Sequence, residues 1–295
     1  MSHYGIFIAV IFESILCITE TENYHITKKM GKMGKLQNKI AVVTGAAMGN
    51  GEGIARVFAN HGARVLLWDI SDQVFDTAKS IESSGGNATG YKVDVTSYDQ
   101  CCRAVESAAS DFGKIDIMCA NAGVIRLGNF LEMTDELRDF HFDINIRGVW
   151  NSCKSVLPGM CRKKDGRIVV LSSVTGPMVA DPGEVAYATT KAALWGFTKA
   201  LAREFAEKNI RVNAICPGYI HTPMADQIAT DSDAEDPKSV LEGIRSGVPI
   251  GRLGKTSEVG ELAAFLTSDE SSYITGTSIV IDGGSTLPET VSVGT

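Results

Sequence analysis

The chain has 295 residues, 44% of them hydrophobic and 21% charged, so it can bury a full core and is neither disordered nor collagen-like. The formal net charge is −7, and the dispersed lysines and arginines form no basic stripe, so we expect no nucleic-acid partner. Thirty glycines against eight prolines indicate tight strand-to-helix turns, as in a glycine-rich enzyme core, rather than proline-rich linkers.

The first apolar run, GIFIAVIFESILCI at residues 5–18, is too short for a membrane span, which needs about 20 apolar residues, and it contains Glu13. It also lacks the basic start and small-residue cleavage site of a secretory signal. We therefore predict that residues 1–32 are an extension outside the domain, disordered or not native, with the natural start near Met33. A weak membrane anchor is the alternative, but we expect no membrane partner.

From residue 40 onward, short runs rich in Val and Ile alternate with longer segments of helical period. The predicted strands are 40–44, 64–69, 89–95, 115–120, 167–173, 210–218 and 278–284. The main predicted helices lie within 130–162, at about 185–208 and near 257–267. Such alternation predicts an α/β fold: a doubly wound parallel sheet with helices on both faces. No repeat or linker divides the series, so we expect a single domain over residues 33–295.

One long stretch, residues 219–250, reads as irregular and carries the acidic run DSDAEDP at 231–237. A long connection late in such a fold is commonly a substrate lid, which is our interpretation here. The alternative is a solvated loop with a short helix.

The first predicted strand ends in the glycine-rich turn TGAAMGNG, which contains Gly45, Gly49, Asn50 and Gly51 and precedes a helix. Glycines let the backbone approach a pyrophosphate, and the helix N-terminus presents free N–H groups to it. The next strand ends at Asp69, where a carboxylate accepts hydrogen bonds from the adenosine ribose and repels a 2′-phosphate. The sequence therefore favours NAD over NADP as the cofactor.

Tyr187 and Lys191 have the i, i+4 spacing that places a phenol and an ammonium group on one helix face. A tyrosine that exchanges protons at neutral pH needs a pKa about 2 to 3 units below its usual value, and a nearby lysine shifts it in that direction. Ser172 and Ser173 stand at the end of a predicted strand, where ligands bind in open α/β sheets.

The joint pattern resembles the short-chain dehydrogenase/reductase family over residues 36–285. It consists of the TGxxxGxG turn, Asp69, Asn121-Ala122-Gly123, Asn145, Ser173, Tyr187 with Lys191, and Pro217-Gly218. The segments 126–130, 172–184 and 282–294 resemble one bacterial subgroup of the family. The resemblance implies a single-domain Rossmann-type fold and a homotetramer. The seven scattered cysteines form no C-x-x-C pair, which fits a reducing cytoplasmic location.

The resemblance also implies roles for single residues. Tyr187 would be the general acid/base, Lys191 would hold the nicotinamide ribose and lower the pKa of Tyr187, and Ser173 rather than Ser172 would polarise the substrate carbonyl. Asn145 matches the helix-kinking asparagine that supports a proton-relay water. In addition to the glycine turn and Asp69, cofactor contacts are implied for Asp94, Val95, Asn121, Gly123, Pro217, Ile220 and Thr222.

Three positions depart from the family pattern: Ala120 replaces the first asparagine of its usual NNAG, Asn50 replaces an isoleucine, and the interval from Ser173 to Tyr187 is one residue longer. Arg126 and His221 follow two turns at the reactive end and are candidate substrate-binding residues, although Arg126 fits a surface ion pair equally well. We expect no metal site.

The sequence thus predicts an NAD(H)-dependent oxidoreductase that interconverts a secondary alcohol (sugar, polyol or small hydroxy compound) and its ketone by hydride transfer. Two alternatives stay open: a carbonyl reductase that prefers NADP, and a catalytically silent dinucleotide-binding regulator.

Overall fold

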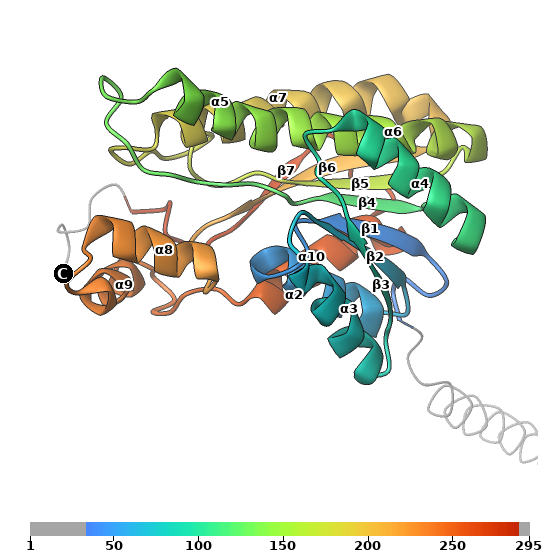
Figure 1. Cartoon of the computed structure of the whole chain (residues 1–295), viewed down its shortest axis with the longest axis horizontal. Helices are drawn as coiled ribbons and strands as arrows, with labels where there is room; N and C mark the ends of the chain where they lie inside the picture. The colour runs from blue at the N-terminus through green and yellow to red at the C-terminus, as the bar shows by residue number, and fades with distance from the viewer. Residues whose placement is uncertain (1–33, 289–295) are drawn as a thin grey trace, which may run out of the picture. The chain divides into compact units, whose positions relative to one another are not determined.

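The computed structural model describes residues 34–288, so the predicted extension 1–32 lies outside the described residues. Within them the chain forms one parallel sheet in the order β3-β2-β1-β4-β5-β6-β7 (Figure 1). The strands are β1 (Ile40–Thr44), β2 (Arg64–Asp69), β3 (Asn87–Lys92), β4 (Ile117–Ala120), β5 (Gly166–Leu171), β6 (Ile210–Pro217) and β7 (Ser278–Ile281). The predicted doubly wound α/β fold is confirmed.

Helices cover both faces of this sheet. One face carries α2 (Gly49–Asn60), α3 (Gln73–Ser83) and α10 (Thr256–Thr267). The other carries α4 (Tyr98–Phe112), α6 (Val149–Lys163) and α7 (Val185–Phe205), with α5 (Asp135–Phe142) leading into α6. Single 3₁₀ turns follow at Ala206–Lys208 and Asp269–Ser271. No helix among residues 34–288 is long and apolar enough to cross a membrane.

The inner strands, such as β1, β4 and β6, consist mostly of apolar residues because both of their faces are buried. Val43 and Leu67 point to the α2 side, whereas their neighbours Val42 and Leu66 point to the α6 side. Burial of each such side chain stabilises the fold by about 1.5 to 3 kcal/mol. Trp68 follows in β2, fully buried, and its indole N–H has no hydrogen-bond partner among the described residues.

Most predicted elements shift by a few residues at their ends, and two of the differences bear on the site. The third strand ends at Lys92, because the apolar residues after it leave the sheet to border a pocket. The helix expected within 130–162 is interrupted by the π-helical turn Asp143–Gly148, which contains Asn145. A π-helical turn is rare and often marks a functional site.

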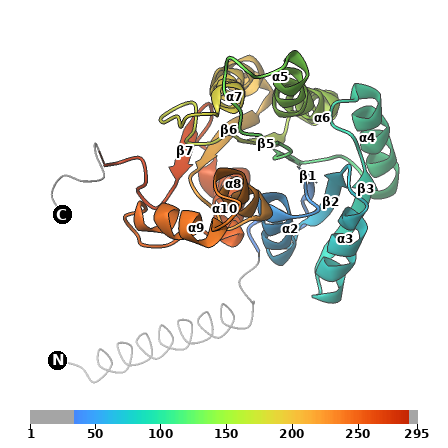
Figure 2. The same cartoon turned by 60° about the vertical axis from the view of Figure 1, so that its left-hand side comes forward.

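The stretch 219–250, expected to be irregular, instead contains α8 (Pro223–Ser232) and α9 (Pro237–Ser246), which lie side by side (Figure 2). Each helix begins with a capping side chain and a proline at its first position. Thr222 accepts a hydrogen bond from the N–H of Ala225, and Asp236 accepts one from the N–H of Ser239. The acidic run joins the two helices, so the prediction of an irregular segment was wrong.

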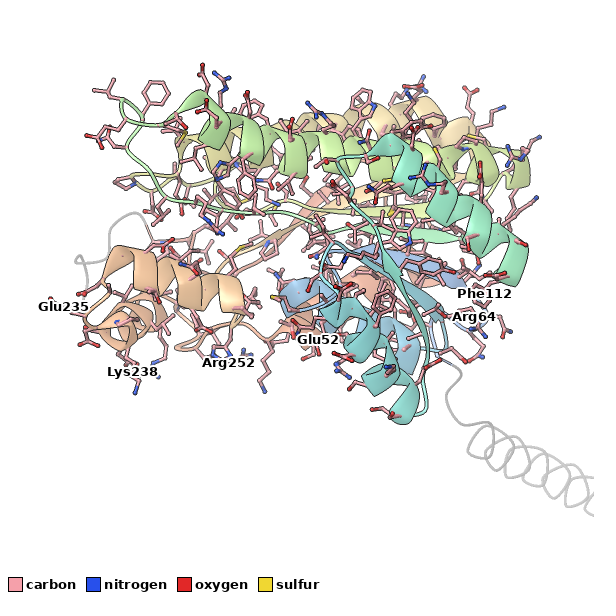
Figure 3. All side chains as sticks on the ribbon, viewed as in Figure 1. Glu52, Arg64, Phe112, Glu235, Lys238 and Arg252 are labelled. Carbon is pink, nitrogen blue, oxygen red and sulfur yellow. The ribbon has the colours of Figure 1, made fainter. Side chains whose placement is uncertain are left out.

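The amino end of the sheet is closed by local contacts. Asp116, which precedes β4, accepts a hydrogen bond from the N–H of Ile40 at 2.8 Å and forms an ion pair with Lys163. The Arg64 guanidinium lies over the Phe112 ring, 4.5 Å from its centre (Figure 3). Side chains thus fill the amino end of the sheet, and a ligand is expected at the carboxyl ends of the strands, as in other open α/β sheets.

Candidate active site

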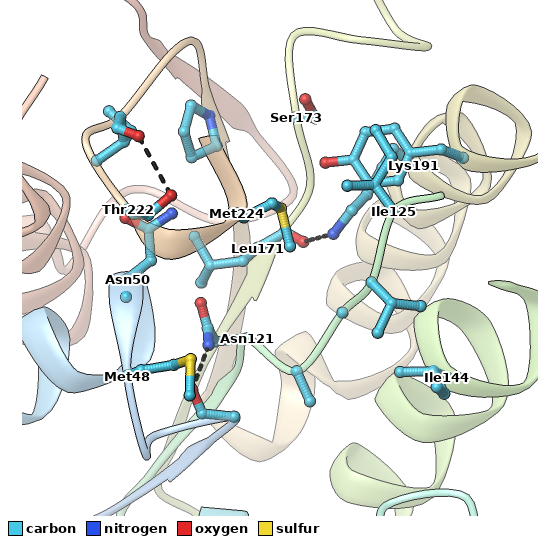
Figure 4. A pocket seen from close by; sticks show the side chains of 18 of the residues that line it. Met48, Asn50, Asn121, Ile125, Ile144, Leu171, Ser173, Lys191, Thr222 and Met224 are labelled. Carbon is cyan, nitrogen blue, oxygen red and sulfur yellow. Dashed lines mark hydrogen bonds between the residues drawn. The ribbon is translucent and has the colours of Figure 1, made fainter. Parts of the chain in front are cut away.

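A pocket of about 410 Å³ opens at the carboxyl ends of the strands, where the chain order of the sheet reverses between β1 and β4 (Figure 4). Most residues that the sequence singled out line it. These are Gly45, Gly49, Asn50, Asp69, Asp94, Val95, Asn121, Gly123, Ser173, Tyr187, Lys191, Pro217, Ile220 and Thr222. The site predicted from separate motifs is therefore one continuous space.

Two glycine positions of the turn, Gly45 and Gly51, leave no room for a side chain. A Cβ atom on Gly51 would lie 2.0 Å from the carbonyl oxygen of Gly45. Gly45 has a φ of +62°, in the left-handed region that favours glycine. The amide of Asn121 donates hydrogen bonds to the carbonyls of Thr44 (2.9 Å) and Gly45 (3.1 Å). The turn is thus held from the end of β4, and the first backbone N–H groups of α2 are left for a ligand.

Asp69 ends β2 at the edge of the same pocket. Its Oδ2 accepts a hydrogen bond from the N–H of Ala47 at 3.0 Å, and its Oδ1 accepts one from the N–H of Ser71 at 2.9 Å. A carboxylate oxygen can accept more than one hydrogen bond, so both oxygens keep capacity for a ligand hydroxyl. The two backbone contacts fix the orientation of the carboxylate.

Ser173, Tyr187 and Lys191 lie together on the other side of the pocket. The Ser173 hydroxyl accepts a hydrogen bond from the N–H of Thr175 at 3.1 Å and lies near enough to Tyr187 to lower the pKa of that phenol. The Lys191 ammonium donates to the carbonyl of Leu171 at 2.8 Å and lies 5.6 Å from the centre of the Tyr187 ring (Figure 4). The neighbouring Ser172 instead bonds the Lys191 carbonyl at 2.8 Å, so Ser173 is the serine that faces Tyr187.

The pKa of Tyr187 differs from the expectation of a lowered value. Burial raises it to about 12, although the hydrogen bond from Ser173 opposes the rise. Burial also lowers the pKa of Lys191 to about 8. In the chain alone, desolvation therefore determines the direction of the shift, and Tyr187 carries its proton at neutral pH.

Asn145 is fully buried and does not line the pocket. Its amide accepts from the N–H of Val124 at 2.8 Å and donates to the Val124 carbonyl and to Thr190, both at 3.0 Å. A Cβ atom on Gly123 would lie 3.3 Å from both the Asn145 oxygen and the Lys191 nitrogen. Asn145 thus fastens the segment after β4 to α7, close to the Lys191 ammonium.

Arg126 and His221 are exposed and lie outside the pocket lining. Arg126 donates to the carbonyl of Ile125 at 2.9 Å rather than into the pocket. Their role in substrate binding stays a prediction. Glu184, a buried lining residue three positions before Tyr187, was not predicted from the sequence. No motif or spacing marks it, because its burial arises only from tertiary packing.

These residues fit a nicotinamide dinucleotide. The cradle at Gly51 and the α2 N-terminus suit a pyrophosphate, and the Asp69 carboxylate suits ribose hydroxyls. Asn50 adds a buried side-chain oxygen that lacks a hydrogen-bond partner among residues 34–288 and borders the pocket. Such an acceptor suits the amide or hydroxyl donors of the same molecule.

Comparison with known proteins gives consistent matches. A family profile described as "Enoyl-(Acyl carrier protein) reductase" matches residues 45–286. Oxidoreductase UcpA of Salmonella typhimurium is 60% identical over 262 residues, which cover 89% of this chain and all of that protein. The 3-oxoacyl-[acyl-carrier-protein] reductase FabG of Thermotoga maritima is 40% identical over 251 residues, or 85% of this chain and 98% of FabG.

Among solved structures, a short-chain type dehydrogenase/reductase from Mycobacterium marinum superposes with a TM-score of 0.79 and 34% identity. The match covers 86% of this chain and 97% of that one. The bacterial subgroup indicated by segments 126–130, 172–184 and 282–294 is confirmed as that of the UcpA oxidoreductases.

Proposed function

Since this chain belongs to the short-chain dehydrogenase/reductase family, we propose that it is an NAD(H)-dependent oxidoreductase that interconverts a secondary alcohol and its ketone. The placement of Ser173, Tyr187 and Lys191 on one side of a pocket that fits a nicotinamide dinucleotide carries this proposal. The substrate would be a sugar, a polyol or a small hydroxy compound.

The bound nicotinamide supplies or takes up the hydride, and the chain's own residues manage the proton. In ketone reduction the Ser173 hydroxyl and the Tyr187 phenol donate hydrogen bonds to the substrate oxygen, and the Tyr187 proton passes to that oxygen. In alcohol oxidation the Tyr187 phenolate takes the hydroxyl proton. The raised pKa of Tyr187 suits the first direction, because the phenol is protonated at neutral pH.

Lys191 stabilises the phenolate when it forms. Lys191 is 5% exposed and its ammonium group is oriented by the Leu171 carbonyl, so little solvent screens the charge. Asn145 does not contact the substrate side of Lys191; it holds the segment that contains Gly123 against α7, next to the Lys191 ammonium. The π-helical turn around Asn145 leaves backbone carbonyls that would hold a relay water.

The preference for NAD over NADP rests on Asp69. Its fixed carboxylate at the end of β2 accepts from ribose hydroxyls and repels a 2′-phosphate. A carbonyl reductase that prefers NADP is the alternative, and the competing affinities of NADH and NADPH separate the two.

A second candidate reaction is reduction of a 3-oxoacyl group, which the 40% identity to FabG favours. That substrate carries a flexible acyl chain, and Met48 and Met224 would offer it adaptable apolar contacts at the pocket. Turnover of a 3-oxoacyl thioester in preference to any simple ketone would establish it.

The central test is Tyr187→Phe, with NADH formation from alcohols as the assay. We expect turnover to fall by about 10²- to 10⁴-fold, because the variant loses its general acid/base. Calorimetric affinity for NADH should stay within about twofold of wild type. Tyr273→Phe, which changes a fully exposed tyrosine, is the matched control. Retained turnover in Tyr187→Phe would refute the assignment, and tight NADH binding without turnover of any substrate by wild type would favour the silent regulator.

We also propose that the protein is a cytoplasmic homotetramer. The outer surface of α6 and α7 carries the aromatic pair Trp150 and Phe197, whose rings are tilted by 46° with centres 5.6 Å apart, and Trp150 is 54% exposed. An apolar surface of this kind suits a subunit contact. All six cysteines among residues 34–288 are free, as in a reducing compartment. Sedimentation analysis tests the assembly.

A further inference from the structure

Glu184 and Asp116 are the two acidic residues that are buried among residues 34–288, and only Asp116 has a basic partner. Asp116 is paired with Lys163 and accepts a backbone N–H. Glu184 is 7% exposed, and no Lys, Arg or His of the described chain lies within ion-pair distance of it. Its Oε2 has no hydrogen-bond partner there and is shielded from bulk water. A buried carboxyl oxygen without a hydrogen-bond partner costs free energy. A ligand in the pocket that donates a hydrogen bond to this oxygen would remove that cost.

The surroundings of the Glu184 side chain are polar as well as buried. Burial and the charge of Asp181 raise the pKa of the Glu184 carboxyl, while the Thr175 hydroxyl and the backbone at Asp181 oppose the rise. The side chain does not cap α7, although Glu184 directly precedes that helix. No helix-capping requirement therefore explains an acid at this position.

The carboxyl group lies beside the reacting groups. Glu184 borders the pocket together with Ser173 and Tyr187, and its charge acts on both Tyr187 and Tyr219. An oxygen held by Ser173 and Tyr187 would therefore place the next carbon of the same molecule near Glu184.

The charges along the pocket restrict what that molecule can be. Lys191 is the one cationic residue among the described residues that line the pocket, and its ammonium is bound to the Leu171 carbonyl. An anionic group beside Glu184 would meet a carboxyl group and no free cation, which disfavours carboxylate, sulfonate and phosphate substrates at this end. A hydroxyl group meets an unused acceptor.

We propose that Glu184 is a substrate-binding residue that accepts a hydrogen bond from a hydroxyl group on the carbon next to the reacting carbon. The favoured substrates are then vicinal diols and α-hydroxy ketones, including polyols and sugars, rather than monofunctional alcohols or 3-oxoacyl chains. This inference rests on the proposed alcohol–ketone chemistry and assigns its substrate class.

The test compares two ketones that differ by the one hydroxyl group, acetoin and butan-2-one, reduced by the full chain with NADH. Wild type should favour acetoin in kcat/KM by about 10- to 100-fold, the range for a hydrogen bond to a charged group. Glu184→Leu should abolish this preference, measured as the ratio of kcat/KM for the two ketones, because an effect on Tyr187 common to both ketones cancels in that ratio. Glu184→Gln keeps an acceptor oxygen and should therefore retain part of the preference for acetoin. Glu204→Gln, at an exposed site on α7, is the matched control.

A binding measurement separates this inference from the proposed function. Butane-2,3-diol should raise the melting temperature of the complex with NADH more than butan-2-ol does, in wild type and not in Glu184→Leu. Diol binding without turnover of either ketone would refute the proposed function and keep the inference. Turnover without a hydroxyl preference in rate or binding would overturn the inference alone. An equal loss on both ketones in Glu184→Leu, with no effect on diol binding, would make Glu184 structural.

Discussion

Asp69→Asn should change which dinucleotide the protein prefers. The substitution removes one negative charge and turns one of two acceptor oxygens into an NH₂ group, which then faces the N–H of Ala47 or Ser71. Loss of one hydrogen bond to a charged group costs about 1.5 to 3 kcal/mol, so NADH affinity should fall by about 10- to 100-fold. NADPH gains instead, since unit charges about 4 Å apart repel by about 1 kcal/mol in water and about 4 kcal/mol near a protein surface.

The measurement is calorimetric titration of both reduced dinucleotides into wild type, Asp69→Asn and Asp72→Asn. Asp72 lies in the same loop but is exposed and paired with Lys92, so its variant carries the same change of net charge away from the pocket. Wild type should bind NADH at least about tenfold more tightly than NADPH. Asp69→Asn alone should shift this ratio by 100-fold or more, because the lost hydrogen bond to NADH and the relieved repulsion of NADPH contribute about 1.5 kcal/mol each. A wild type without preference, or an equal shift in Asp72→Asn, would refute the reasoning.

Two further outcomes are expected. The rate of ketone reduction should stay level up to about pH 8, because Tyr187, with a pKa raised to about 12, keeps its proton and Lys191, with a pKa lowered to about 8, keeps its charge. Alcohol oxidation needs the phenolate and should rise by up to about tenfold per pH unit over the same range. Stopped-flow rates in both directions test this, and oxidation independent of pH would contradict it. Asp116→Ala should lower the free energy of unfolding by about 2 kcal/mol in urea titrations, because the N–H of Ile40 loses its acceptor and Lys163 its partner; an unchanged midpoint would show that the ion pair is dispensable.

The sequence predicts the strands well where burial on both faces makes the apolar run continuous. The runs at 40–44 and 64–69 coincide with β1 and β2. Prediction fails where local signals compete: the valines after Lys92 look like strand but line the pocket. The helices α8 and α9 were missed because the acidic run between them resembles a loop.

The site residues were predicted from motifs, but their electrostatics were not. A phenol and an ammonium one helical turn apart predict a lowered pKa for Tyr187, whereas the folded chain surrounds both groups and raises it. Desolvation depends on tertiary packing, which no local spacing reports. The same reason hid Glu184, since its unpartnered oxygen exists only after the loop before α7 has folded over it.

Trp68 gives the protein an internal optical probe. It is fully buried in β2, borders the dinucleotide pocket and directly precedes Asp69. The other two tryptophans, Trp150 and Trp195, do not line the pocket. A buried indole emits at shorter wavelengths than a solvated one, and that emission overlaps the absorption band of a reduced nicotinamide. Resonance energy transfer from Trp68 should therefore quench its emission when the reduced dinucleotide binds, so occupancy can be followed without any label and independently of turnover.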